Sequence, residues 1–273
     1  MHRANAAIER RFVDTRSGRR HIATAGEGFP LLLLHQTPRS WDEYRDVLPL
    51  VGRSYRAIAM DTPGFGDSDP VPEGEDSIEA WASAAHDLLD ALALEQVAIA
   101  GHHTGAAIAI EMAASRPTRV RALVLSASPF VDAARRERHR GRRVIDEVDR
   151  HADGRHLLEL WRNRSPFYPE GDVALLERFI VDALKAGHRA AAGHHVVDRY
   201  VMEARLPLVS CPTLVIAPTG DPHAHPHAHK VAGAIARAKL VELESGLVPL
   251  PDHMPDAFAR VVSEFLAEEL KGR

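Results

Sequence analysis

Short apolar runs alternate with longer amphipathic stretches along the first half of the chain. Each run is rich in Leu, Ile, Val and Ala, the composition of a strand that is buried on both faces. The runs predict strands at residues 30–35, 55–60, 97–100 and 120–126. Residues 11–15 and 20–24 are predicted to form a hairpin at the start of the chain. Three helices are predicted at residues 41–51, 77–92 and 106–115. Strands separated by helices form a parallel sheet with helices on both faces.

The alternation stops at about residue 131 and resumes at about residue 207. The stretch between is rich in Arg and His, is helical in pattern and has no buried-strand run. After it, the pattern predicts strands at 213–217 and 239–244 and helices at 227–238 and 254–270. The chain therefore predicts an α/β protein with a doubly wound sheet domain in two pieces. We expect the sheet domain at residues 1–130 and 207–273, and a helical cap inserted at residues 131–206.

Composition is that of a globular protein and argues against several function classes. An apolar fraction of 45% over 273 residues is enough for a sizeable core, and a net charge of −4 gives no footprint for nucleic acid or an anionic membrane. Cys211 is the only cysteine, which excludes an intrachain disulfide and a thiolate metal cluster. No apolar segment is long enough to span a membrane. We expect a cytoplasmic protein that acts on a small molecule without a cofactor or metal; a homodimer is left open.

Residues 101–105, Gly-His-His-Thr-Gly, carry the most specific signal in the chain. They lie between a predicted strand and a predicted helix, where the pattern Gly-x-nucleophile-x-Gly marks a sharp turn known as the nucleophile elbow. The outer glycines are needed because the middle residue adopts a strained backbone and the flanking positions lie against the neighbouring strand and helix. Here the middle residue is His103, in place of serine, aspartate or cysteine.

Three further motifs, in the same order along the chain, resemble those of the α/β-hydrolase fold superfamily. Residues 34–38, Leu-His-Gln-Thr-Pro, are similar to the oxyanion loop His-Gly-x-Pro, and residues 61–69 are similar to the turn Asp-x-Pro-Gly-Phe-Gly-x-Ser after the fourth strand. Residues 211–216, Cys-Pro-Thr-Leu-Val-Ile, resemble the strand before the acid loop, and Asp221 stands at the acid position. The layout resembles the capped branch, which includes epoxide hydrolases, haloalkane dehalogenases and C–C hydrolases. The resemblance implies a hydrolase with a lid.

The chain departs from this family at three catalytic positions. His103 replaces the nucleophile, so the acyl-enzyme or alkyl-enzyme route does not carry over. Leu247 or Val248 stands where the family places its catalytic histidine, and His253 is an alternative if that loop has shifted. Gln36 replaces the glycine of the oxyanion loop.

We interpret His103 as a general base that has moved to the elbow. Imidazole has an ordinary pKa of about 6.5, so it can take a proton from water or from an acidic carbon without a serine. Asp221 can orient it, and the backbone amides of Thr104 and Gly105, with the Gln36 amide, can stabilise an oxyanion. The resulting hypothesis is hydrolysis of a small ester, lactone or other carbonyl compound. The alternatives are a cofactor-independent lyase or isomerase, and a non-catalytic ligand-binding protein.

Other residues near these motifs are candidates for the pocket. They are His35, Trp41, His102 and His225. The histidine-rich residues 223–229 form either a solvated loop or, with His103, a site for a divalent ion. The Arg-rich residues 135–143 form either a solvated face or a means of attracting an anionic substrate.

Overall fold

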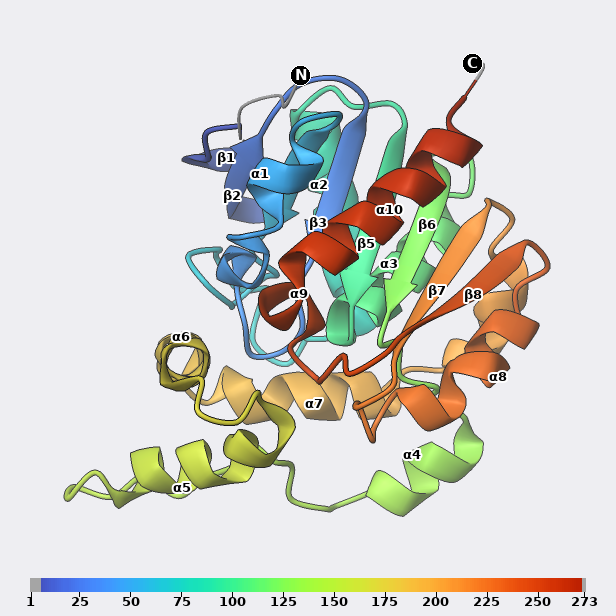
Figure 1. Ribbon diagram of the computed structural model, residues 1–273. Coiled ribbons are helices and arrows are strands. Elements are labelled where there is room, and N and C mark those ends of the chain that lie inside the picture. Colours follow the sequence, from blue (N-terminus) through green and yellow to red (C-terminus); the bar gives the residue numbers. More distant parts are fainter. Residues whose placement is uncertain (1–5, 272–273) are drawn as a thin grey trace.

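One sheet of eight strands lies at the centre of residues 6–271, the part of the chain that this computed structural model describes (Figure 1). In order across the sheet, the strands are β1 (Glu9–Thr15), β2 (Gly18–Ala25), β4 (Arg56–Met60), β3 (Pro30–Leu34), β5 (Val97–His102), β6 (Val120–Ser126), β7 (Thr213–Pro218) and β8 (Ala238–Leu243). The pairs β1–β2 and β2–β4 are antiparallel, and all other neighbours are parallel. The predicted α/β fold with a mostly parallel sheet is confirmed.

Helices cover both faces of this sheet and bury two separate apolar cores. One face carries α2 (Ile78–Ala91), α3 (Thr104–Ser115) and α8 (Ala228–Gly233), and the other carries α1 (Leu48–Val51), α9 (Leu250–His253) and α10 (Pro255–Glu269). In β3, Leu32 and Leu34 belong to the first core and Leu31 and Leu33 to the second, because successive side chains of a strand point to opposite faces. All four are fully buried, as the continuous apolar run predicts.

Two of the predicted helices are shorter or more broken than their patterns indicate. The helix expected at 41–51 is a 3-10 helix, η1 (Trp41–Tyr44), followed by α1. Pro49 lies in the first turn of α1, and because it has no backbone N–H it cannot continue a helix that began before it. The helix expected at 227–238 begins with a 3-10 turn, η5 (His225–His227), and ends at Gly233, a poor helix former.

The chain between β6 and β7 forms helices joined by turns and irregular segments, has no strand, and lies along the edge of the sheet where the parallel strands end (Figure 1). Its elements are α4 (Ala133–His139), α5 (Arg155–Arg164), η2 (Ser165–Phe167), α6 (Val173–Ala186), α7 (Arg189–Arg199), η3 (Met202–Ala204) and η4 (Leu206–Leu208). We call residues 131–206 the helical insert. Its helices α5 and α6 share a small apolar core of their own, centred on Leu160, Leu176 and Phe179.

Buried ion pairs join the helical insert to the sheet domain. Arg39, fully buried after β3, places its Nε 2.8 Å from Asp182 Oδ2 on α6 and also pairs with Asp252 on α9. Arg178 of α6 places its Nε 2.8 Å from Asp42 Oδ2 on η1. A buried charge that loses its partner is strongly destabilising, so these contacts fix the insert against the loop that follows β3.

Replacing Arg39 tests that attachment. In Arg39→Met the carboxylates of Asp182 and Asp252 lose their shared cation inside the protein, and we expect the free energy of unfolding to fall by about 3 kcal/mol or more. Chemical denaturation at neutral pH measures the change. The matched control is Arg260→Met, because Arg260 is exposed on α10 and its ion pair with Glu264 is 3.8 Å long. A loss no larger in Arg39→Met than in the control would contradict the anchoring role.

Candidate active site

His103 stands at the turn between β5 and α3 with a strained backbone. Its φ is 48° and its ψ is −110°, a region that costs a residue with a side chain about 1–3 kcal/mol. Its N–H donates to the carbonyl of Ser126 at 3.0 Å, and its own carbonyl accepts from the N–H of Ala106 at 2.9 Å. These bonds hold the turn and direct the imidazole toward the insert.

The glycines on either side of the turn allow three backbones to meet. A Cβ atom at position 101 would lie 2.2 Å from the carbonyl oxygen of Gly105. A Cβ atom at Gly105 would lie 1.9 Å from the carbonyl oxygen of Leu34, at the end of β3. Both distances are far below any van der Waals contact, so the pattern of glycines is required by the close packing of β3, β5 and α3.

The imidazole of His103 lies against a buried carboxylate from the loop after β7. His103 Nε2 lies at ion-pair distance, 2.8 Å, from Asp221 Oδ2, and neither atom has another partner among residues 6–271. The other oxygen, Oδ1, accepts the N–H groups of His223 and Ala224 at 2.8 and 3.1 Å. Burial raises the pKa of Asp221, but the charge of His103 and these amides outweigh it and leave the pKa below its ordinary value. Asp221 is therefore an anion at neutral pH.

His102 packs edge-on against the ring of His103, with the two ring centroids 4.8 Å apart, and it is fully buried in the sheet domain. Its Nδ1 is 3.0 Å from Ser126 Oγ, and its Nε2 is 2.8 Å from the carbonyl oxygen of Val248, in the loop after β8. Burial, with the nearby charge of His103, lowers the pKa of His102 well below its ordinary value, so this imidazole is neutral and donates to Val248 through Nε2–H. This bond holds the loop after β8, where Leu247 and Val248 stand in place of the catalytic histidine of the family.

The loop after β3 contributes Gln36 and Thr37 to the site. Gln36 donates twice to Glu43 of η1, from its backbone N to Oε2 at 2.9 Å and from its side-chain Nε2 to Oε1 at 2.6 Å. The backbone N–H of Thr37 donates to Thr104 Oγ1 at 3.3 Å. Sequence reasoning missed Glu43 and Thr37. Glu43 is one of three acidic residues in this stretch, with Asp42 and Asp46, and no local pattern distinguishes it from the other two.

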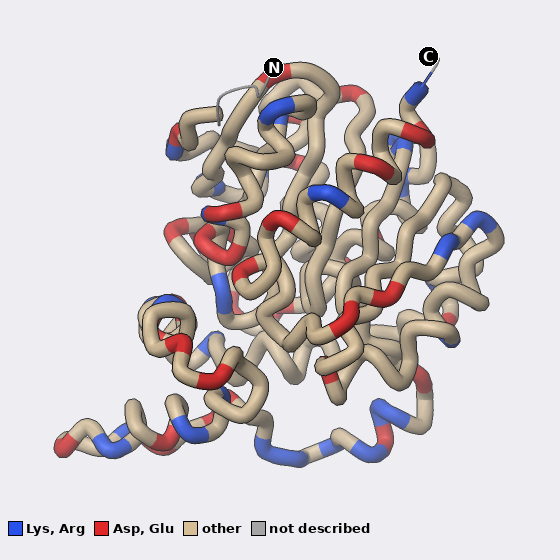
Figure 2. The backbone as a smooth tube through the Cα atoms, in the orientation of Figure 1, with Lys and Arg blue, Asp and Glu red and all other residues tan. Residues whose placement is uncertain are grey.

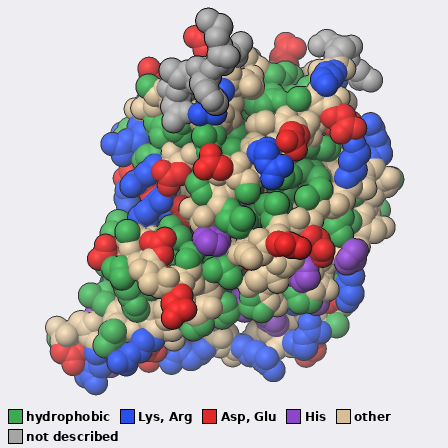
Figure 3. Space-filling view, in the orientation of Figure 1, with side chains coloured by type: hydrophobic (Ala, Val, Ile, Leu, Met, Phe, Trp, Pro, Cys, Tyr) green, Lys and Arg blue, Asp and Glu red, His purple; other side chains and the backbone are tan. Residues whose placement is uncertain are grey.

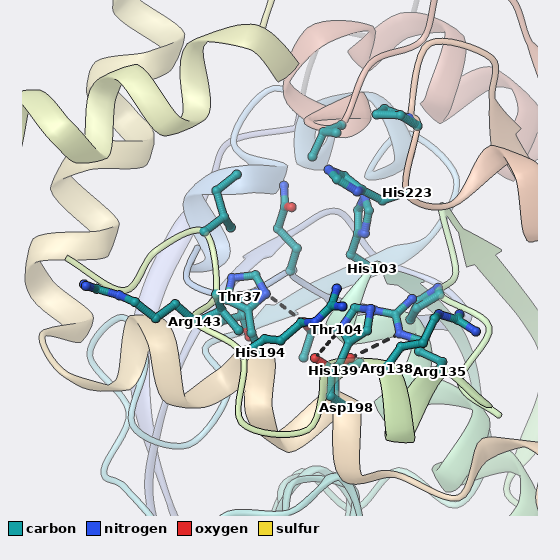
Figure 4. A pocket seen from close by; sticks show the side chains of 18 of the residues that line it. Thr37, His103, Thr104, Arg135, Arg138, His139, Arg143, His194, Asp198 and His223 are labelled. Atoms are coloured by element: carbon teal, nitrogen blue, oxygen red, sulfur yellow. Dashed lines mark hydrogen bonds and ion pairs between the residues drawn. The ribbon is translucent and has the colours of Figure 1, made fainter. Parts of the chain in front are cut away.

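A cavity of about 450 Å³ lies between these residues and the helical insert (Figure 4). The sheet domain lines it with His103, Gln36, Thr37, Thr104, Pro129, Pro222, His223, His227 and Val248. The insert lines it with Arg135, Arg138, His139, Arg142, Arg143, Val144, Ile145, Arg164, His194, Val197 and Asp198. Figure 4 shows the side chains of His103, Thr104, His194, and of Arg135 and Arg138 from α4, around this one space. The volume is typical of sites for small molecules.

Comparison with known proteins decides the family. Residues 30–179, more than half of the chain, match the family model described as alpha/beta hydrolase fold. The chain belongs to the α/β-hydrolase fold family. It is similar to 2-hydroxymuconate semialdehyde hydrolase of Pseudomonas sp. (strain CF600), with 36% identity over 116 residues that cover 41% of each chain. It is also similar to the soluble epoxide hydrolase of Corynebacterium sp. (strain C12), with 38% identity over 95 residues that cover 35% of this chain and 33% of that protein.

Solved structures show the fold over a longer span than these relatives do. The enol-lactonase from Burkholderia xenovorans LB400 superposes with a TM-score of 0.79 at 20% identity, covering 94% of this α/β-hydrolase and 100% of that chain. The matches to the two curated relatives span only about a third to two fifths of their length. Among the described residues no helix is both long and apolar enough to cross a membrane.

Four of the predicted pocket residues of this α/β-hydrolase do not line the cavity. His102 is held behind the elbow, as described above, and His35 is buried with its Nε2 accepting the N–H of Thr62 at 2.9 Å. Trp41 packs instead beside His21 and under the guanidinium of Arg10. His225 lies 2.9 Å, Nε2 to Oε1, from Glu242 of β8, because the 3-10 turn η5 directs it away from the cavity.

The histidine-rich residues 223–229 contribute to the cavity, but not through His225, the residue predicted from sequence. His223 and His227 line the cavity in place of His225, and the ring of His223 lies 4.8 Å from that of Phe167 in the insert. Residues 223–229 do not converge with His103 as ligands of an ion. Within residues 6–271 the one group spaced like metal ligands is His21, Asp61 and Asp67. There, the carboxylate of Asp61 already accepts the N–H groups of Trp41 and Asp67, which shape the turn after β4. His253, the alternative base, does not line the cavity.

The packing at the elbow predicts a large effect of one methyl group. In Gly105→Ala the new Cβ meets backbone atoms of β3, which cannot move aside as a side chain can. We expect the free energy of unfolding to fall by at least about 2 kcal/mol. The matched control is Gly233→Ala on α8, where a Cβ meets nothing within 4 Å and where alanine is the better helix former. Equal stability of the two variants in urea denaturation would show that β3 and α3 are not in this close contact.

Glu43 predicts a pH dependence of stability. Burial, with the charge of Asp252, raises the pKa of Glu43 to about 8, while Arg39 and the two bonds from Gln36 oppose the rise. The ordinary pKa of Glu is 4.5. Between pH 4.5 and pH 8 the folded protein therefore holds a proton that the unfolded chain has released, so stability falls as pH rises through this window.

Glu43→Gln removes this contribution and retains the size of the side chain. We expect the fall in Tm between pH 5 and pH 8 to be smaller in the variant than in the unmodified protein. The control is Glu264→Gln, on the exposed face of α10, which should keep the full fall. The same fall in all three proteins would mean that Glu43 is ionised throughout the range.

Proposed function

We propose that this α/β-hydrolase hydrolyses a small ester, lactone or related carbonyl compound with His103 as the general base. The observation that carries the proposal is the placement of His103 at the strained elbow, beside the ionised Asp221 and facing a cavity of about 450 Å³. Strain of this kind persists where the surrounding structure enforces it, and it is concentrated at functional sites. The names of the curated relatives, all hydrolases, support the reaction class.

The two nitrogens of His103 have different tasks in this reaction. Nε2 faces Asp221, so Nδ1 is the nitrogen that can take a proton. Nδ1 accepts a proton from water as the water oxygen bonds to the substrate carbonyl carbon. The bond from that carbon to the leaving oxygen then breaks, and the leaving oxygen takes the proton back from Nδ1. The carboxylate of Asp221 stabilises the imidazolium between the two transfers.

The first turn of α3 supplies donors to the oxyanion that forms. The first N–H groups of a helix have no acceptor within it and carry partial positive charge, and Thr104 begins α3 at the cavity. One N–H of the Gln36 carboxamide donates to Glu43. Its second N–H can still donate to the oxyanion, and its carbonyl oxygen can accept a hydrogen of the attacking water.

One further reaction uses the same residues. The elbow has no hydroxyl or carboxylate nucleophile, and the hydroxyl oxygen of Thr104 accepts the N–H of Thr37 and is nearly buried. A base without a nucleophile suits removal of a proton from a carbon next to a carbonyl, so lyase or isomerase chemistry is the second candidate. In either reaction, the helical insert, residues 131–206, is proposed to act as the cap that covers the substrate.

Release of 4-nitrophenol from short-chain esters tests the base. We expect kcat/KM in His103→Ala to fall at least about 100-fold, the scale of a lost general base. Because the variant leaves the buried Asp221 Oδ2 without its partner, its Tm should also fall, so rates are compared well below that Tm. Asp221→Asn should lower the rate while leaving the imidazole in place. Rates are measured at several pH values around 7.

The matched control is His225→Ala. His225 is a surface imidazole held by Glu242, and exposed histidines hydrolyse such esters slowly without a site. The control should keep the full rate. Equal rates in His103→Ala and the unmodified protein would rule out ester hydrolysis by His103. Exchange of deuterium into a ketone, dependent on His103 and without ester turnover, would favour the second candidate.

A further inference from the structure

Five arginines line the cavity, and all of them come from the helical insert. They are Arg135, Arg138, Arg142, Arg143 and Arg164. The lining contains a single carboxylate, Asp198, in the part of the chain that the structure describes. Figure 2 shows the run of positive residues along α4 and the segment after it, and Figure 3 shows Lys and Arg side chains along the same lower edge of the molecule. The cavity wall opposite the elbow is therefore strongly positive.

Three of these arginines are paired with carboxylates of the insert. Arg135 Nε lies 3.1 Å from Asp198 Oδ1, and Arg164 Nε donates to Asp146 Oδ1 at 2.7 Å. Arg143 Nη1 lies 3.3 Å from the exposed Asp149. The remaining two, Arg138 and Arg142, have no ion pair or side-chain hydrogen bond with any residue from 6 to 271. Two guanidinium groups at the cavity are thus left for a ligand.

Two of the cavity histidines, His223 and His227, add little positive charge. Burial lowers the pKa of His223, and the positive charges of His103, Arg164 and Arg135 lower it further against the pull of Asp221. Burial, with Lys230, Arg135 and Arg138, lowers the pKa of His227. Both imidazoles are therefore neutral at pH 7, whereas the arginines that line the cavity keep their charge at every working pH.

We propose that the cavity selects an organic anion, a substrate with a carboxylate at one end and the reacting carbonyl at the other. Arg138 and Arg142 bind the carboxylate, and the carbonyl lies at His103. Guanidinium groups match a planar carboxylate in geometry as well as charge. Like charges gathered around one space repel each other, and a bound anion relieves that repulsion. Only the carbonyl end of this inference rests on the proposed function; the anion site stands on the insert alone.

Two esters that differ only in a terminal carboxylate show whether the cavity recognises the charge of the substrate or only its size and shape. They are the 4-nitrophenyl monoester of adipic acid and 4-nitrophenyl hexanoate, which have the same number of carbons in the acyl chain. We expect the unmodified protein to favour the charged ester in kcat/KM. In the double variant Arg138→Gln/Arg142→Gln, KM for the charged ester should rise about 10- to 100-fold, the range expected for a lost charge-assisted hydrogen bond. KM for the neutral ester should change by no more than about twofold.

The matched control is Arg260→Gln, which removes an exposed arginine on α10 and should leave both esters unaffected. A parallel measurement needs no turnover: binding of adipate to the unmodified protein and to the double variant by calorimetry at low ionic strength. We expect the affinity for adipate to fall by the same factor as the KM effect.

The outcomes separate this inference from the proposed function. Adipate that binds through Arg138 and Arg142 without hydrolysis of either ester would support the anion site and overturn the hydrolase. Hydrolysis of both esters at equal kcat/KM, unchanged in the double variant, would support the hydrolase and overturn the anion site. A loss of both esters together in the double variant would also overturn it, because the arginines would then act on the reaction and not on the carboxylate.

Discussion

The close approach of three backbones at the elbow is the constraint on which the site depends. The end of β3, the end of β5 and the first turn of α3 meet where only glycine fits, at Gly101 and Gly105. This contact forces the residue between them into a positive φ and holds its side chain at the carboxyl edge of the sheet. The chemistry of the elbow is therefore set by a single side chain, whereas its geometry is set by the packing around it. The fold places the side chain of residue 103 at this edge whatever its type, and in this chain that residue is histidine.

Buried charge connects that edge of the sheet to the helical insert. Arg39 lies in the loop after β3, next to Pro38, and pairs with carboxylates from α6 and α9, while Glu43 of η1 accepts two hydrogen bonds from Gln36. Gly193 of α7 completes the junction, since a Cβ there would lie 2.4 Å from the side chain of Thr37. The loop that faces the cavity is thus positioned from one side by the sheet and from the other by the insert. Movement of the insert would alter the loop as well as the opening of the cavity.

The site divides its ionisable groups by their burial. His102 and His35 are enclosed and neutral, because the cost of burying a charge lowers their pKa values. Asp221 is equally enclosed but ionised, because His103 and two backbone amides lie against it. Across the cavity the arginines stay charged beside solvent. His103 thus lies between the enclosed, neutral His102 on one side and the cavity lined by arginines on the other.

The sequence by itself determined the sheet and the elbow turn, and it predicted that Asp221 would lie beside His103. Continuous apolar runs such as that of β3 predict strands because both faces are buried, and the glycines at 101 and 105 predict the turn because no other residue fits there. Tertiary structure alone decided which of several similar side chains face the cavity. Neighbours such as His102 and His103 differ only in direction, and His223, His225 and His227 lie in irregular turns without a periodic pattern. Glu43 became visible only in the fold, because its partners Gln36, Arg39 and Asp252 come from a loop and a distant helix. The local sequence pattern indicates which residues are buried. Which side chains face the cavity, and which partners they bind, depends on residues that come together only after folding.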